Sequence, residues 1–276
     1  IPFAKHSNSY LKVESNSNDR LLNPLLKKAL RGANIPVMEL RFSQNNILLV
    51  REMFGRINSN SMSLTKQELY NAIYANSAFK RVIYSETEKL QNDEYWGNAG
   101  RVFEKAKRDR MGNQARLGTI FIVLIKNRIY DKDDEVEATY QKYNEKWEDE
   151  TKVVKKFQKL GNAIKKILPG PSQFSRNITE CYTLFQVLDS LMEQGINIYT
   201  AAVKKVIKET LKEFMTNYNR YKDIRKKIIQ ENPENWRQKI DLSSYLEVYN
   251  DAVTKEIHRQ MARDTRFTIL KDLLLP

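Results

Sequence analysis

Cysteine and histidine are scarce in this chain of 276 residues. The single cysteine, Cys181, cannot form an internal disulfide, which excludes the framework of a small disulfide-rich secreted protein and suits a reducing cytoplasm. We interpret it as a small buried apolar side chain. The two histidines, His6 and His258, are far apart in sequence and cannot complete a zinc site with one cysteine, so we predict no metal ligands.

Glycine, proline and long apolar runs are also lacking. The chain has 9 glycines and 7 prolines, fewer than a loop-rich β protein or a disordered segment would carry. No apolar run reaches the roughly 18 residues of a membrane-spanning helix. We therefore predict a mainly α-helical protein in the cytoplasm, a multi-helix bundle with at most one or two short strands near the N-terminus and no membrane contact.

Sequence motifs for catalysis are missing as well. The chain contains no Gly-x-Ser-x-Gly elbow, no Walker-type phosphate loop and no dinucleotide fingerprint. The acidic run from Asp131 to Glu135 does not begin an EF-hand, because Val136 and Lys142 occupy the positions that need glycine and a bidentate acid. We predict no catalytic residue, no complete active site and no cofactor in this chain.

Positive charge is abundant. The chain has 47 lysines and arginines against 34 acidic residues, a net charge of +13 that favours polyanions. Two clusters are candidate nucleic-acid contacts, with Tyr218 and Tyr221 interleaved in the second for stacking on bases. The alternative places these tyrosines in the core and the lysines merely in solvent. The candidate residues are Arg101, Lys105, Lys107, Arg108 and Arg110, then Lys204, Lys205, Lys208, Lys212, Arg225, Lys226 and Lys227.

Local signals divide the chain into three parts. Residues 1–20 are polar and predict a flexible lead-in. The helix-stopping tripeptide Pro169-Gly170-Pro171 separates a helical subdomain, 21–168, from a C-terminal helical subdomain, 172–276. We expect three notable helices: a buried one from Thr119 to Ile129, a long basic one from about Tyr199 to Ile229, and a last one from about Ser243 to Arg263.

Two helix starts carry recognisable caps. Thr65 and Glu68 form a capping-box pattern, and Asn177 precedes a run suited to a helix. The acidic stretch 131–150 and the lysine-rich stretch 151–166 could form one long helix or two in a hairpin.

The segment from Ile35 to Phe42 alternates apolar and polar residues, as a half-buried strand does. A lone strand cannot satisfy its own backbone hydrogen bonds, so its partner is expected elsewhere. The chain also begins with Ile1 rather than methionine. Together these features indicate a fragment of a longer protein.

One segment has a specific pattern. Phe54 to Asn58 reads as the end of a helix, a turn of small residues follows, and Leu64 to Ala72 begins a capped helix. This order, preceded by the strand-like Ile35–Phe42, resembles the signature of the GmrSD-type restriction and phage-defence family. The strong resemblance covers 35–75, and weaker similarities occur at 107–111 and 264–267.

The resemblance implies a bacterial modification-dependent restriction or phage-defence protein. The N-terminal half of that family has a ParB/sulfiredoxin-like fold and carries Asp-Gly-Gln-Gln-Arg for nucleotide hydrolysis. That motif is absent here, so the chain would be the helical half only. For the parent protein the resemblance implies nucleotide and Mg²⁺ as cofactors, and it implies the missing N-terminal half or a partner subunit as partner.

The resemblance also places Asn58 and Arg56 near the nucleotide. Asn58 could equally be a helix C-cap, because asparagine tolerates left-handed backbone geometry. Asn60-Ser61 stands where relatives often have Gly-Gly, which removes the usual close approach to phosphate. The predicted function is to support that pocket and contact DNA or another nucleic acid. The alternative is a helical protein-interaction module without nucleic-acid binding.

Overall fold

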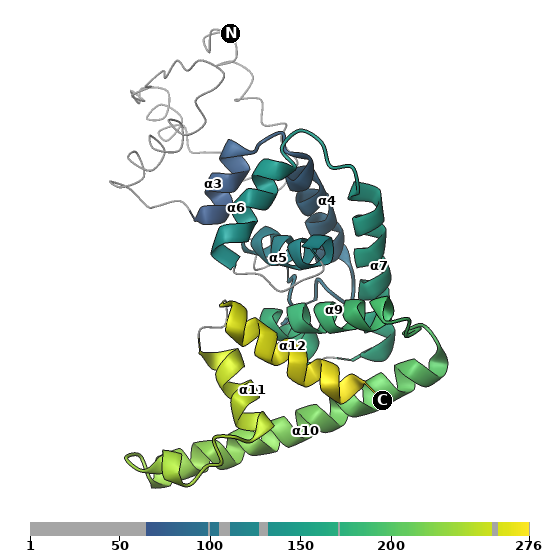
Figure 1. The fold of residues 1–276 in the computed structure, drawn as a ribbon. Helices are drawn as coiled ribbons and strands as arrows, with labels where there is room; N and C mark the ends of the chain where they lie inside the picture. Colours follow the sequence, from purple (N-terminus) through teal and green to yellow (C-terminus); the bar gives the residue numbers. More distant parts are fainter. Residues whose placement is uncertain are drawn as a thin grey trace, which may run out of the picture. The chain divides into compact units, whose positions relative to one another are not determined.

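A computed structural model describes residues 65–98, 100–104, 111–126, 132–170, 172–255 and 259–275. These residues form ten α-helices and one short 3-10 helix, with no strand among them (Figure 1). The prediction of a mainly α-helical, multi-helix fold is confirmed. The predicted lead-in 1–20, the strand Ile35–Phe42 and the family-like turn around Asn58 lie outside the described residues.

The first described helices are α3, Lys66–Ile73, and α4, Ala78–Asn92. The predicted capping box at the start of α3 is confirmed. The backbone N–H of Glu68 donates to Thr65 Oγ1 at 3.2 Å, and the N–H of Thr65 donates to Glu68 Oε2 at 2.6 Å. Two otherwise unpaired amide groups are thereby satisfied, which fixes where α3 begins.

The central helix α5, Gly112–Lys126, has a continuous buried stretch from Leu117 to Leu124. The burial is as predicted, but the predicted start at Thr119 is wrong, since the helix begins at Gly112. Gly118 lies inside the helix rather than at its entrance. An internal glycine costs a helix roughly 1 kcal/mol, and here α5 is also held by its contacts with α4, α7 and α9.

Two separate helices carry the acidic and basic stretches: α6, Lys132–Lys142, and α7, Glu150–Ile167. After α7 the chain forms the short α8, Gln173–Arg176, and then α9, Ile178–Glu193. The predicted cap of α9 is confirmed, because Asn177 Oδ1 accepts from the N–H of Thr179 at 2.8 Å and of Glu180 at 3.4 Å.

The C-terminal part begins with α10, Ala201–Glu231, a helix of 31 residues that contacts α7 and α12. The 3-10 helix η3, Trp236–Gln238, follows it. The single last helix predicted from Ser243 to Arg263 is wrong: α11, Tyr245–Thr254, and α12, Gln260–Leu274, are separate. The break lets α12 pack against both α11 and α9, which one continuous helix could not do.

Aromatic rings join the helices into one core. Phe121 of α5 lies 4.8 Å from Phe157 of α7, measured between ring centroids, and Phe157 lies 5.4 Å from Phe185 of α9. The core is therefore shared by residues before and after the tripeptide at 169–171. All described residues belong to one compact unit, Ile47–Pro276. None of the described helices has both the length and the apolarity needed to cross a membrane.

Candidate nucleic-acid interface

The first predicted basic cluster is described only at Arg101. This side chain is 7% exposed, its guanidinium contacts Ser175 Oγ, and its Cζ lies 4.5 Å from the centre of the Tyr95 ring. Arg101 thus packs the 100–104 loop against α8 and is not presented to solvent. Five predicted site residues, Lys105, Lys107, Arg108, Arg110 and Arg56, lie outside the described residues, as does Asn58.

The second predicted cluster lies along α10. Lys205, Lys208, Lys212, Lys226 and Lys227 are exposed, whereas Lys204 is half-buried. Within the cluster, Lys205 and Lys227 lie 4.0 Å from Glu209 and Glu231, at the limit for an ion pair. Such surface pairs contribute little to stability, so these amines remain accessible to an anion.

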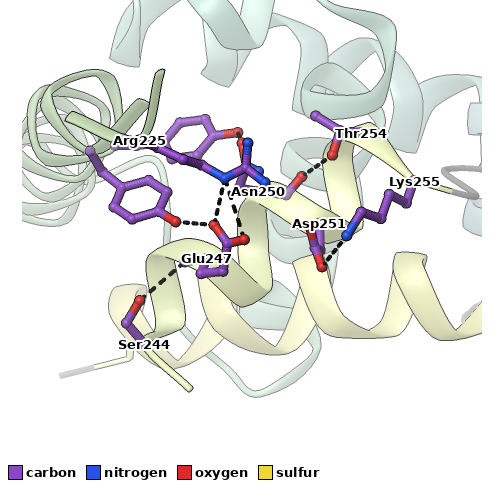
Figure 2. A network of polar contacts seen from close by, with 9 residues as sticks. Arg225, Ser244, Glu247, Asn250, Asp251, Thr254 and Lys255 are labelled. Atoms are coloured by element: carbon purple, nitrogen blue, oxygen red, sulfur yellow. Dashed lines mark hydrogen bonds and ion pairs between the residues drawn. The ribbon is translucent and has the colours of Figure 1, made fainter. Parts of the chain in front are cut away.

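Arg225 differs from its neighbours on α10. Figure 2 shows its guanidinium directed at Glu247 of α11, and Nε lies 3.0 Å from Glu247 Oε2. The carboxylate is almost fully buried, and the backbone of Glu247 is held by Ser244, whose hydroxyl caps α11 by accepting from the Glu247 N–H at 3.3 Å. Tyr221 donates to the same carboxylate. Arg225 therefore joins α10 to α11.

Tyr218 of α10 does not offer a free face to a base. Tyr218 is 1% exposed, packs edge-on against Tyr249 at 5.3 Å between ring centroids, and has its hydroxyl 3.3 Å from Asn250 Oδ1. Burial raises the pKa of Tyr218. The predicted alternative, in which this tyrosine belongs to the core, is confirmed, and stacking of Tyr218 on a base is excluded.

A groove of about 690 Å³ lies beside the first half of α10. Its apolar side chains include Leu168 and Pro169 from the segment after α7, and Met215 from α10. Its charged side chains are Arg176 from α8 and Lys208 and Lys212 from α10, with no acidic residue among those that line it. The remaining lining residues are Ile167, Gly170, Ser172, Gln173, Phe174, Leu211, Thr216 and Asn219.

Local sequence explains this geometry. Pro169 stops α7, whose last turn is closed by a 2.8 Å hydrogen bond from the N–H of Leu168 to Ile164 O. The chain then turns into α8, which brings Arg176 to the groove. Lys208 and Lys212 are four positions apart and so lie on one face of α10.

The three cations of the groove, which we call the groove cations, are Arg176, Lys208 and Lys212. Within the part of the chain that the structure describes, none of them forms an ion pair. Like charges at this helical spacing destabilise a helix by about 0.2–0.5 kcal/mol, so the repulsion between Lys208 and Lys212 does not stabilise α10. A bound anion would remove the repulsion.

Arg176, Leu168 and Met215 were not among the residues expected at a site. The sequence could have identified Met215 as a residue of the same surface, because it lies three positions after Lys212 and therefore on the same face of the helix. No local signal identifies Arg176, since its approach to α10 depends on the tertiary contact between the α7–α8 segment and α10.

Other chemistry is sparse in the described residues. No group of three or more histidines, cysteines, aspartates or glutamates there is placed to hold a metal ion. Cys181 is fully buried, as predicted, and burial raises the pKa of its thiol.

Comparison of the chain with protein-family models, curated proteins and solved structures found no significant match.

Proposed function

We propose that this chain binds single-stranded nucleic acid along the first half of α10. One observation carries the proposal: the groove cations line the same groove as an apolar surface, and no acidic side chain lines that groove. Lysine and arginine pair with phosphates, and the apolar surface of Leu168, Pro169 and Met215 suits the faces of unpaired bases. A single strand can supply both parts at once, whereas the bases of a duplex are stacked inside it.

The test is fluorescence anisotropy with a labelled single-stranded oligonucleotide across a series of salt concentrations. Neutralising phosphates releases counterions, so affinity should fall as salt rises. The double variant Lys208→Gln/Lys212→Gln removes two phosphate contacts. It should reduce the slope of log K against log salt by about 1.4, because each contact on a single strand contributes about 0.7.

A matched control is available on α7. Lys155 and Lys159 are exposed, are also four positions apart, and do not line the groove. Lys155→Gln/Lys159→Gln makes the same change in net charge and should leave the slope and affinity nearly unchanged. The proposal would be contradicted by equal losses of oligonucleotide affinity in the α10 and α7 variants, or by an unaltered protein that does not bind the oligonucleotide at low salt.

We further propose that this binding serves a cytoplasmic bacterial restriction or phage-defence protein of the GmrSD type. The support is the sequence pattern from Phe54 to Ala72. In that proposal Asn58 and Arg56 approach a nucleotide held by another part of the parent protein or by a partner subunit. Asn58→Ala in the full-length parent should then lower nucleotide hydrolysis. Unchanged hydrolysis by a folded variant would argue against this role.

A second candidate function is a helical module that binds a protein partner. The observation in its favour is a groove of about 700 Å³ beside α11 and α12, where Leu242, Val248 and Met261 are 49%, 38% and 81% exposed. Exposed apolar patches commonly mark protein contacts. The expected occupant is the apolar face of a partner helix. Absence of nucleic-acid binding at low salt would favour this candidate over the first.

A further inference from the structure

A second cavity, independent of the groove beside α10, lies where α5, α6 and α7 meet. It has a volume of about 520 Å³, which is in the range of small-molecule sites. Three helices contribute to its wall, and the loop between α6 and α7 adds Tyr143, Trp147 and Asp149. We call it the lysine cavity. Its lining residues are Leu124, Ile125, Lys126, Ala138, Thr139, Lys142, Tyr143, Trp147, Asp149, Lys152, Val153 and Lys156.

Four amines line the lysine cavity against a single carboxylate, that of Asp149. Two amines are already paired: Lys126 with Glu135, and Lys156 with Asp189 at 2.8 Å. The other two, Lys142 and Lys152, form no ion pair within the described parts of the chain, although Lys142 Nζ lies 5.0 Å from the centre of the Tyr143 ring. Both of these amines are exposed, and the carboxylate of Asp149 offsets one of their charges, so the wall of the cavity carries an excess of one positive charge.

Trp147 supplies an independent observation. It lines the cavity, is 5% exposed, and its buried Nε1–H has no hydrogen-bond acceptor among the described residues. Its ring is packed against Phe79 at 5.5 Å and Tyr143 at 5.2 Å, so the indole cannot turn easily toward solvent. Buried donors are nearly always paired in folded proteins, and an unpaired one requires an explanation.

We propose that the lysine cavity binds a small anion bearing more than one phosphate group. Lys142 and Lys152 approach from the end of α6 and the start of α7, and each amine offers three donors to phosphate oxygens. Lys126 and Lys156 add positive charge at the wall. The Trp147 N–H supplies a neutral donor. A ligand with two linked phosphates can meet amines from both helices, which a single carboxylate cannot.

The probe is inorganic pyrophosphate, titrated into the whole chain at low salt by isothermal titration calorimetry. The unaltered protein should bind it with one site per chain. Lys142→Gln/Lys152→Gln should weaken binding at least about tenfold, because it removes two charged donors. Trp147→Phe keeps an aromatic ring but removes the N–H, and should weaken binding about fivefold.

Two controls separate this site from general attraction to a basic protein. Lys155→Gln/Lys159→Gln, on the same helix α7 but outside the cavity, should leave pyrophosphate binding unchanged. Lys208→Gln/Lys212→Gln should also leave it unchanged while weakening nucleic-acid binding. The opposite pattern would overturn the proposal: no pyrophosphate binding by the unaltered protein, equal losses in the α7 control, or loss only in the α10 variant. Thermal unfolding of each free variant verifies that the fold is intact.

Discussion

Gly161 offers a direct test of the packing between α7, α9 and the residue Trp96. It lies in the interior of α7 and is buried. A methyl group built on it would meet Trp96 Nε1 at 3.8 Å and Phe185 Cζ at 3.9 Å, which are ordinary van der Waals distances. Replacing Gly161 with alanine should therefore fill space without displacing a neighbour.

The expected gain has two parts. Alanine is about 0.8–1 kcal/mol more favourable than glycine inside a helix, and a buried methyl group adds up to about 0.8 kcal/mol. Gly161→Ala should thus raise the free energy of unfolding by about 1–2 kcal/mol. For a domain of this size, each 1 kcal/mol corresponds to about 2–4 °C in Tm, which circular dichroism during heating measures.

Gly97→Ala is the contrasting variant. Its methyl group would lie 2.1 Å from the backbone oxygen of Gln91, and a backbone atom cannot move aside as a flexible side chain can. This variant should lose about 1–3 kcal/mol or more. A lower Tm for Gly161→Ala would refute the packing described here, and equal effects at both positions would refute the reasoning from these distances.

Three further predictions concern charged or reactive groups. Arg266→Met should lower the free energy of unfolding by about 3–5 kcal/mol, measured by urea denaturation, because it removes a buried guanidinium that lies near Glu180 and donates to the backbone oxygen of Ala252. Burial alone would raise the pKa of Asp93, but Lys165 and the amides of Trp96 and Tyr95 have the larger combined effect and hold the pKa below its ordinary value. The ionised Asp93 therefore stabilises the fold when the pH is above the ordinary pKa of an aspartate, and this stabilisation is lost as the pH falls through the pKa of Asp93 in the folded state. Asp93→Asn should consequently weaken the dependence on acidic pH of the free energy of unfolding in urea. Cys181 should resist alkylation by iodoacetamide in the native protein and react in denaturant, as mass spectrometry can show.

Capped helix starts were the most predictable part of the fold, whereas the start of α5 and the end of α11 were predicted wrongly. Thr65 and Asn177 cap helices by hydrogen bonds within three residues, and such signals depend only on neighbours in sequence. The end of α10 is also determined by neighbours in sequence, because Pro233 disfavours helical backbone at the residue before it. The break between α11 and α12 was missed, because it is stabilised by contacts of α12 with α9 rather than by a local glycine or proline.

The candidate sites were less predictable than the helices. Charge alone could not distinguish exposed Lys208 from Arg101, whose burial depends on Tyr95 and on Ser175, a residue distant in sequence. Likewise, Tyr218 shares a helix with the lysines but faces Tyr249 of α11. Which cations reach solvent is decided by tertiary packing. The lysine cavity was missed for the same reason, since three different helices contribute its amines.

In the proposed function, the length of α10 sets the footprint on the nucleic acid. Lys205 and Lys227 stand near its two ends, and at a rise of 1.5 Å per residue their backbones are about 33 Å apart. A strand held only by the groove cations would leave most of the length of α10 without contacts to the strand. Neighbouring protein chains could then bind close together along the same strand. A strand that follows the whole helix would space them farther apart. The number of chains bound per unit length of a long strand therefore measures how much of α10 takes part.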